Sequence, residues 1–133
     1  MDNSEHLTPS RADQVVILVA DDEPMIRNLT RIVLEDEGYF ILAAADGEEA
    51  LVLSRTFPGF IHLLLTDVDM PKVNGLQLRE RLREERPATK VLLMSGQVHM
   101  ALEKAFLPKP FGPDVLKERV RQMLFASRGT GSG

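Results

Sequence analysis

Two apolar runs that end in acidic residues constrain the fold of this chain more than any other feature. Residues 15–20 are apolar throughout and lead directly into Asp21 and Asp22, while the largely apolar run 61–66 is closed by Asp67. Such runs are typical of strands that are buried on both faces of a parallel sheet. Because open α/β sheets bind ligands at the carboxyl ends of their strands, we expect these carboxylates to meet at one edge.

Segments with helical periodicity alternate with the apolar runs along the chain. The predicted strands cover residues 15–20, 40–44, 61–66, 90–94 and 105–108. The predicted helices begin at Pro24, after Asp46, after Asn74 and at Pro113, with a short additional helix at about 98–104. Five strands alternating with helices predict a doubly wound α/β fold, in which right-handed crossovers cover both faces of a parallel sheet.

Composition narrows the classes of function. The chain has 133 residues, which suits one domain, and it has no cysteine, which excludes disulfides and thiolate sites. A formal net charge of -4 without any basic run argues against nucleic-acid binding by this domain. No apolar stretch reaches the roughly 20 residues of a membrane span, and no signal peptide is evident, so we expect a cytoplasmic protein without membrane contact.

The domain boundaries follow from polar termini. Residues 1–13 predict a flexible N-terminus, and the small polar residues 127–133 predict a disordered tail, a linker or an engineered remnant. We expect one folded domain over residues 14–126. The sequence indicates no second domain, so this domain either stands alone or has been excised from a larger protein.

Five side chains should gather at the carboxyl ends of the strands: Asp21, Asp22, Asp67, Ser95 and Lys109. Three carboxylates in one place repel each other unless a cation joins them, and Mg²⁺ (or Mn²⁺) prefers oxygen ligands. Asp22 and Asp67 can each give one oxygen, Asp21 can hold a metal-bound water, and a backbone carbonyl just after Asp67 can complete the protein ligands.

Chemistry on a phosphoryl group fits this set of residues. The second oxygen of Asp67 can attack phosphorus and form an acyl phosphate, while the ammonium of Lys109 and the hydroxyl of Ser95 stabilise the phosphoryl oxygens. Each residue also has a plainer interpretation: acids at a helix N-terminus, turn residues, or an exposed loop lysine. Their coincidence at four strand ends favours the functional interpretation.

Four motifs resemble the receiver domain of two-component response regulators. They are VADDEP at residues 19–24, LLTDVDMPKVNG at 64–75, VLLMSG at 91–96 and FLPKPF at 106–111. The resemblance covers about residues 14–126. It implies a flavodoxin-like sheet with the strand order 2-1-3-4-5.

The resemblance also implies the metal and phosphoacceptor positions. Asp67 corresponds to the phosphoacceptor aspartate, and Asp21 and Asp22 correspond to the acidic pair that binds Mg²⁺. Asp69 stands where the backbone carbonyl is the third protein ligand.

Further positions of the resemblance concern switching. Ser95 and Lys109 correspond to the hydroxyl residue and the lysine of the family, and Phe106 takes the place of an aromatic residue that swings inward when Ser95 moves toward the phosphoryl group. Because phenylalanine has no hydroxyl, any switching must rest on packing alone. The bond before Pro110 corresponds to a peptide bond that is cis in many receivers.

Two features depart from the family pattern. Ser95 and Lys109 are fourteen positions apart, which is shorter than expected by about two helical turns, so we predict a shortened or irregular fourth helix. Asp69 adds a carboxylate where water must approach to hydrolyse the acyl phosphate. We hypothesise that Asp69 and Gln97 tune the lifetime of the phosphoryl group.

The predicted function is therefore a signalling switch. A histidine kinase or a histidine phosphotransfer protein should donate a phosphoryl group to Asp67 in a Mg²⁺-dependent reaction, and the conformational change should reach an output partner that the sequence does not name. Beyond autophosphorylation from small donors and slow self-dephosphorylation, we expect no enzymatic activity. A monomer or weak dimer is expected, and the chain is compatible with a fragment of a hybrid histidine kinase.

Two alternatives stay open at this point. One is a pseudo-receiver that binds partners without being phosphorylated. The other is a phosphatase of the haloacid dehalogenase type, because Asp67-Val68-Asp69 is similar to the Asp-x-Asp motif of those enzymes. That motif normally opens the first strand of a longer chain, whereas here it follows the third.

Overall fold

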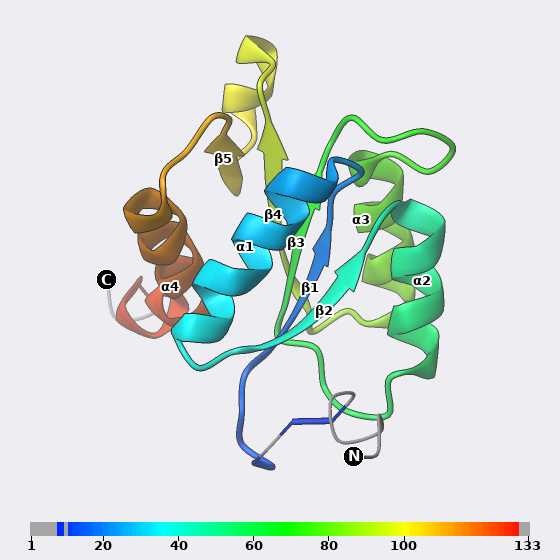
Figure 1. Ribbon diagram of the computed structural model, residues 1–133, viewed down its shortest axis with the longest axis vertical. Helices are drawn as coiled ribbons and strands as arrows, with labels where there is room; N and C mark the ends of the chain where they lie inside the picture. The colour runs from blue at the N-terminus through cyan, green and yellow to red at the C-terminus, as the bar shows by residue number, and fades with distance from the viewer. Residues whose placement is uncertain (1–7, 10, 131–133) are drawn as a thin grey trace.

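A single parallel sheet with helices on both faces forms the centre of the molecule (Figure 1). The computed structural model describes residues 8–9 and 11–130. Its strands are β1 (Val16–Ala20), β2 (Phe40–Ala44), β3 (Leu63–Asp67), β4 (Lys90–Ser95) and β5 (Phe106–Pro108). They lie in the order β2-β1-β3-β4-β5, and every neighbouring pair is parallel, which confirms the predicted fold class.

The two faces of the sheet are covered by different helices. The helices are α1 (Pro24–Asp36), α2 (Gly47–Thr56), α3 (Gly75–Glu85), α4 (Pro113–Thr130) and the 3₁₀ helix η2 (Val98–Leu102). Alternate residues of β1 divide between two apolar clusters, since side chains along a strand point to opposite faces. Ile17 packs with residues of α1 and α4, and Leu18 packs with residues of α2 and α3.

Local sequence signals set the starts of the helices. Pro24 occupies the first turn of α1, where its missing N–H has no helical partner to lose. The carboxylate of Asp46 accepts the backbone N–H of Glu49 at 2.8 Å and caps α2. Asn74 and Gln77 form a reciprocal capping box at the start of α3. The caps predicted at Asp46 and Asn74 are thus present.

Strand β3 begins at Leu63, two residues later than predicted, and includes Asp67. The side chain of His62 explains the late start, because its Nδ1 accepts the backbone N–H of Val16 at 3.0 Å. A main-chain carbonyl would take that N–H in a continued ladder. The hydroxyl of Thr89 meanwhile donates to the carbonyl of Ile61 at 2.6 Å, so Ile61 is fixed outside the strand.

The segment between β4 and β5 contains the five-residue η2, in agreement with the predicted shortening of the fourth helix. At the other end, α4 continues to Thr130, four residues into the segment 127–133 that we interpreted as a disordered tail, a linker or an engineered remnant. No proline interrupts the helix there. Residues 131–133, and residues 1–7 and 10 of the expected flexible N-terminus, lie outside the described part of the chain. Within that part, no helix is long and apolar enough to cross a membrane.

The imidazole of His62 lies at the end of the sheet opposite the acidic residues. Burial lowers the pKa of His62 below its ordinary value. The N–H that Val16 donates to Nδ1 also requires this nitrogen to be unprotonated. The ring of Phe60 packs against the imidazole edge-on, with ring centroids 4.7 Å apart. The folded protein therefore favours the neutral form of His62.

This preference predicts how stability depends on pH. Because the pKa of His62 is lower in the folded than in the unfolded chain, the unfolded chain binds more protons, and the free energy of unfolding should fall as the pH drops below about 6.5. Asn at this position keeps an acceptor and does not titrate. Urea denaturation at about pH 7.5 and about pH 5.5 should show a smaller loss for His62→Asn than for the wild type. Equal losses would contradict this assignment.

Candidate functional site

The carboxyl ends of four strands bring the predicted site residues to one edge of the sheet. Asp21 follows β1, Asp67 ends β3, Ser95 ends β4 and Lys109 follows β5. Strand β3 lies between β1 and β4, so Asp67 occupies the centre of this edge. The backbone N–H of Lys109 donates to the carbonyl of Ser95 at 2.9 Å, which extends the pairing of β4 with β5 beyond the strands.

Three carboxylates converge at the centre of the edge. Asp21, Asp22 and Asp67 each offer one oxygen, and these oxygens lie within 4.8 Å of one another. Asp21 is fully buried and Asp67 is 4% exposed, whereas Asp22 faces solvent. The cluster is therefore open to solvent on the side of Asp22. Carboxylate oxygens suit a hard divalent cation such as Mg²⁺, so these three residues can hold a metal ion.

The ammonium of Lys109 lies beside these acids. Its Nζ is 3.0 Å from Asp21 Oδ2, 3.4 Å from Glu23 Oε1 and 3.5 Å from Asp67 Oδ1. Burial acts to lower the pKa of Lys109, but the hydrogen bond and charge of Asp21, the charge of Asp67 and the hydrogen bond to Glu23 outweigh it and raise the pKa. The lysine therefore stays charged and supplies a fixed positive charge next to Asp67.

The surroundings of Asp67 destabilise the charged form of its carboxylate. Burial raises the pKa of Asp67 to about 6; Lys109 opposes this shift and the charge of Asp21 adds to it. One lysine thus does not offset the desolvation of Asp67 and its repulsion from Asp21. A divalent cation would relieve both, which is the fit expected of a metal site.

Backbone and side-chain hydrogen bonds hold the acids in place. Asp21 Oδ1 accepts the N–H of Glu23 at 3.0 Å, and the guanidinium of Arg27 donates to the Asp21 carbonyl at 2.8 Å. The buried hydroxyl of Thr66 donates to the carbonyl of Asp67 at 2.9 Å. Sequence reasoning missed the contributions of Glu23 and Arg27. For Glu23 the signal was its place in the acidic run that begins at Asp21; no comparable signal marked Arg27.

Ser95 makes its described side-chain hydrogen bonds away from Asp67. Its Oγ accepts the backbone N–H of Gln97 at 3.0 Å and donates to Asp69 Oδ2 at 3.4 Å. The side-chain amide of Gln97 donates to the other oxygen of Asp69. Asp69 and Gln97 are therefore joined to Ser95 in one hydrogen-bonded group. The sequence had indicated these two residues only as candidates for tuning the lifetime of the phosphoryl group.

The ring of Phe106 packs close to the residue that follows Asp67. It is half-buried on β5 and packs against an apolar cluster formed by Val68, Leu93 and Met100. Val68 immediately follows Asp67, and Met100 belongs to η2. The Lys109–Pro110 peptide bond is cis, as the resemblance implied.

Gly75 fixes the loop that follows Asp67. Its N–H donates to the carbonyl of Val68 at 3.0 Å, which brings the start of α3 against the backbone at the end of β3. A Cβ atom at Gly75 would lie 2.8 Å from Val68 Cα and closer still to the carbonyl of Asp67. Only glycine allows this approach without moving the backbone that carries Asp67.

Replacement of Gly75 by alanine should therefore destabilise the fold by about 1–3 kcal/mol, the usual cost of overpacking. Because alanine favours a helix more than glycine does, helix propensity alone would stabilise the variant, and a loss of stability must come from the steric crowding of the added Cβ. Gly96→Ala is a control, because its added Cβ would meet no described neighbour nearer than the carbonyl of Lys109 at 3.9 Å. Urea denaturation of both variants gives the comparison, and equal stability changes would contradict the expected crowding.

Comparison with known families agrees with this geometry. The model of the response regulator receiver domain matches residues 17–121. The chain therefore belongs to the response regulator receiver domain family. Its five-stranded sheet and the cluster formed by Asp21, Asp22 and Asp67 are those of a two-component signalling module.

Two curated relatives show the kinds of protein that contain similar domains. The chain is 33% identical over 116 residues to the alkaline phosphatase synthesis transcriptional regulatory protein PhoP of Bacillus subtilis, a match that covers 81% of this chain and 48% of PhoP. It is 32% identical over 116 residues to the sensor kinase CckA of Brucella abortus, with 81% of this chain and 12% of CckA covered. The match thus spans half or less of each relative.

Solved structures with the same fold include chemotaxis and response regulators. Chemotaxis response regulator CheY4 of Vibrio cholerae superposes with a TM-score of 0.75 at 26% identity, over 84% of this chain and 99% of CheY4. Response regulator TrrA of Thermotoga maritima, in complex with Mg²⁺ and BeF, gives a TM-score of 0.72 at 35% identity, over 84% of this chain and all of TrrA. Family membership leaves no support for the alternative of a haloacid dehalogenase phosphatase.

Proposed function

We propose that Asp67 accepts a phosphoryl group from a phosphohistidine of a partner protein and that the domain then changes conformation. The observation that carries this proposal is the placement of the buried Asp67 carboxylate, whose Oδ1 lies 3.5 Å from the ammonium of Lys109, among two further acids in a receiver fold. A pseudo-receiver would have no need of such a cluster. We therefore favour phosphorylation over binding alone.

Asp22, Asp67 and the backbone carbonyl of Asp69 would hold Mg²⁺ (or Mn²⁺), with Asp21 acting through a water. The bound metal would neutralise negative charge on the phosphoryl oxygens. One oxygen of Asp67 forms the bond to phosphorus while the bond from phosphorus to the donor nitrogen breaks, and the electron pair of that bond returns to the imidazole. Lys109 stabilises the phosphoryl oxygens as a fixed charge.

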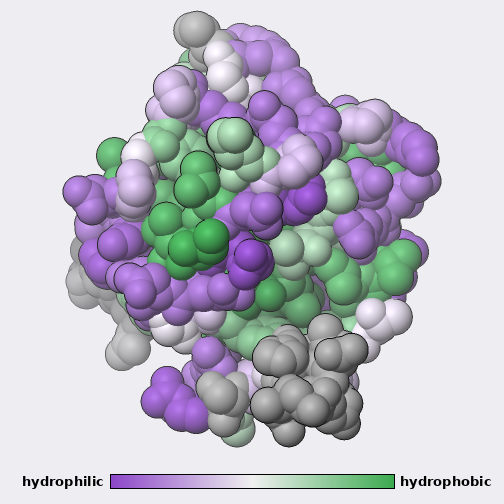
Figure 2. All heavy atoms as spheres, viewed as in Figure 1, coloured by the Kyte–Doolittle hydropathy of each residue, from purple (hydrophilic) through white to green (hydrophobic). Residues whose placement is uncertain are grey.

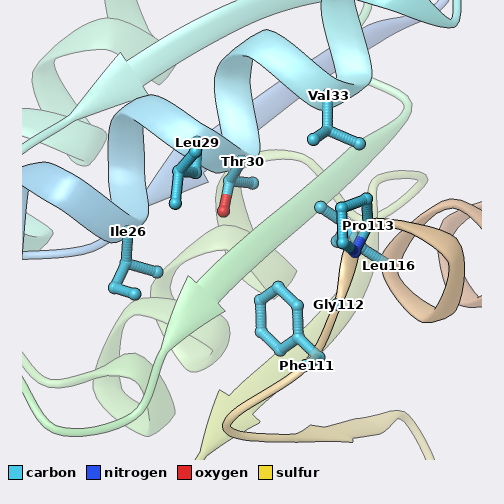
Figure 3. A pocket seen from close by; sticks show the side chains of 8 residues that line it. All are labelled: Ile26, Leu29, Thr30, Val33, Phe111, Gly112, Pro113 and Leu116. Atoms are coloured by element: carbon cyan, nitrogen blue, oxygen red, sulfur yellow. The ribbon is translucent and has the colours of Figure 1, made fainter.

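The partner would be a histidine kinase or a histidine phosphotransfer protein. A protein whose histidine reaches Asp67 must also contact the surface next to Asp67. Helix α1 contributes to that surface, because it begins two residues after Asp22. Met25 and Leu29 on α1 are 73% and 55% exposed, and Figure 2 shows hydrophobic side chains gathered over this helix. A small cavity of about 90 Å³ continues the apolar surface between α1 and the start of α4, between Ile26 and Phe111 (Figure 3).

Within a longer protein, the same module would serve as the receiver of a response regulator or of a hybrid histidine kinase. The similarity of the chain to a segment of PhoP and to a segment of the sensor kinase CckA supports both contexts. We propose no catalysis beyond autophosphorylation from small phosphodonors and slow self-dephosphorylation. A cytoplasmic location and a monomeric or weakly dimeric state are part of the same proposal.

Incubation with acetyl phosphate and Mg²⁺ tests the proposal directly. The wild type should gain one phosphoryl group by mass spectrometry, and beryllium fluoride with Mg²⁺ should shift the backbone NMR resonances at the ends of β1, β3 and β5. Asp67→Asn should show neither response, because it lacks the nucleophilic oxygen. Asp69→Asn keeps the backbone carbonyl and should still respond. The proposal is wrong if the wild type gains no phosphoryl group and shows no NMR shifts, or if Asp67→Asn is still phosphorylated.

The lifetime of the phosphoryl group gives a separate prediction. Once Ser95 turns to the phosphoryl group, the exposed carboxylate of Asp69 can accept a hydrogen bond from an attacking water, with Gln97 beside it. Removing this acceptor in Asp69→Asn should lengthen the lifetime by about two- to tenfold, the range for a single hydrogen bond. Phosphoprotein decay after removal of the donor measures the effect. An unchanged lifetime removes the idea.

A further inference from the structure

The carboxylate of Asp69 joins two loops beside the phosphorylation site. Oδ2 accepts the Ser95 hydroxyl at 3.4 Å, and Oδ1 accepts the side-chain amide of Gln97. Asp69 belongs to the loop between β3 and α3, whereas Ser95 and Gln97 lie at the end of β4 and just before η2. These side chains are therefore a physical connection between the loop that carries the phosphoacceptor and the loop that follows β4.

The Ser95 hydroxyl has one hydrogen to donate. While that hydrogen is donated to Asp69, it is not available to a phosphoryl oxygen on Asp67. Both acceptors are anionic, and the long 3.4 Å contact of Ser95 with Asp69 is one that a phosphoryl oxygen can replace. Asp69 in the unphosphorylated protein and the phosphoryl group in the phosphorylated protein therefore compete for the same donor.

The structure leaves space beside Gly96, which lies between Ser95 and Gln97. A Cβ added to the intervening Gly96 would find its nearest neighbour, the carbonyl of Lys109, at 3.9 Å. The 3₁₀ helix η2 that follows has only five residues, and it is supported by short-range bonds such as the one from the Met100 N–H to the Gln97 carbonyl at 3.1 Å. The residues after Ser95 are thus held by short-range bonds, whereas the carbonyl of Ser95 itself accepts the N–H of Lys109 at 2.9 Å.

We infer that the contact of Asp69 with Ser95 and Gln97 is an autoinhibitory latch. It holds the loop between β4 and η2 in its unphosphorylated position, and a phosphoryl group on Asp67 releases it by taking the Ser95 hydroxyl. The latch rests on the proposed phosphorylation of Asp67. It lowers the population of the active conformation in the absence of phosphate, and Met100 and Phe106, which pack in one apolar cluster, carry the change to β5.

NMR of the metal-free, unphosphorylated protein tests the latch. The methyl group of Met100 and the ring of Phe106 are the reporters, and wild type with and without beryllium fluoride and Mg²⁺ defines their active and resting positions. Asp69→Ala removes both acceptors and should move the reporters toward the active positions, with an active population about tenfold above that of the wild type, as expected for the loss of a hydrogen bond to a charged group. Gln97→Leu should move them less.

Glu35→Ala is the charge control, because it removes an exposed carboxylate on α1 whose described ion pair is with Arg31 of the same helix. Its reporters should stay at the resting positions. If Asp69→Ala also stays there while the wild type responds to beryllium fluoride, the latch does not exist. If the wild type itself fails to respond, the proposed phosphorylation fails instead. Asp69 is exposed, so the variant should fold, and the dispersion of its spectrum checks this.

Discussion

Crowding of like charges at the edge of the sheet is the constraint on which the rest of the site depends. Asp21 and Asp67 are withdrawn from water, and their repulsion is only partly balanced by the ammonium of Lys109. Such an arrangement is costly in a resting protein, because buried carboxylates lose their hydration. It is useful where the protein must attract a divalent cation and then a phosphoryl group. In the proposed function, the site would give up some stability in order to bind a divalent cation and accept a phosphoryl group.

The parallel sheet makes this crowding possible. In β1 and β3, Ala20 is paired with Thr66, so the residues that follow them, Asp21 and Asp67, emerge at the same level. In β4 and β5, Ser95 is paired with Pro108, which places Lys109 one residue beyond. The strand register thus sets the height of each functional group. The backbone N–H of Glu23, just before α1, and the guanidinium of Arg27 within α1 then orient Asp21 through hydrogen bonds.

Much of this could be predicted from the sequence, because apolar runs and helix caps are local signals. The caps at Asp46 and Asn74 and the meeting of Asp67 with Lys109 follow from such patterns, whereas the strand order was implied by the resemblance to receiver domains. The late start of β3 could not, since it depends on a side-chain nitrogen of His62 replacing a main-chain acceptor. The orientation of Ser95 was equally hidden, because a hydroxyl chooses among nearby acceptors only after the loops have been placed.

The brevity of η2 has a mechanical consequence for the domain. Ten residues separate Ser95 from Phe106, and Met100 in the middle of that stretch packs in the same cluster as the phenyl ring. A long helix in this position could absorb a small displacement by bending or sliding. A five-residue turn leaves few residues over which a shift could be spread, so a displacement near Ser95 would reach the packing around Leu93 through Met100.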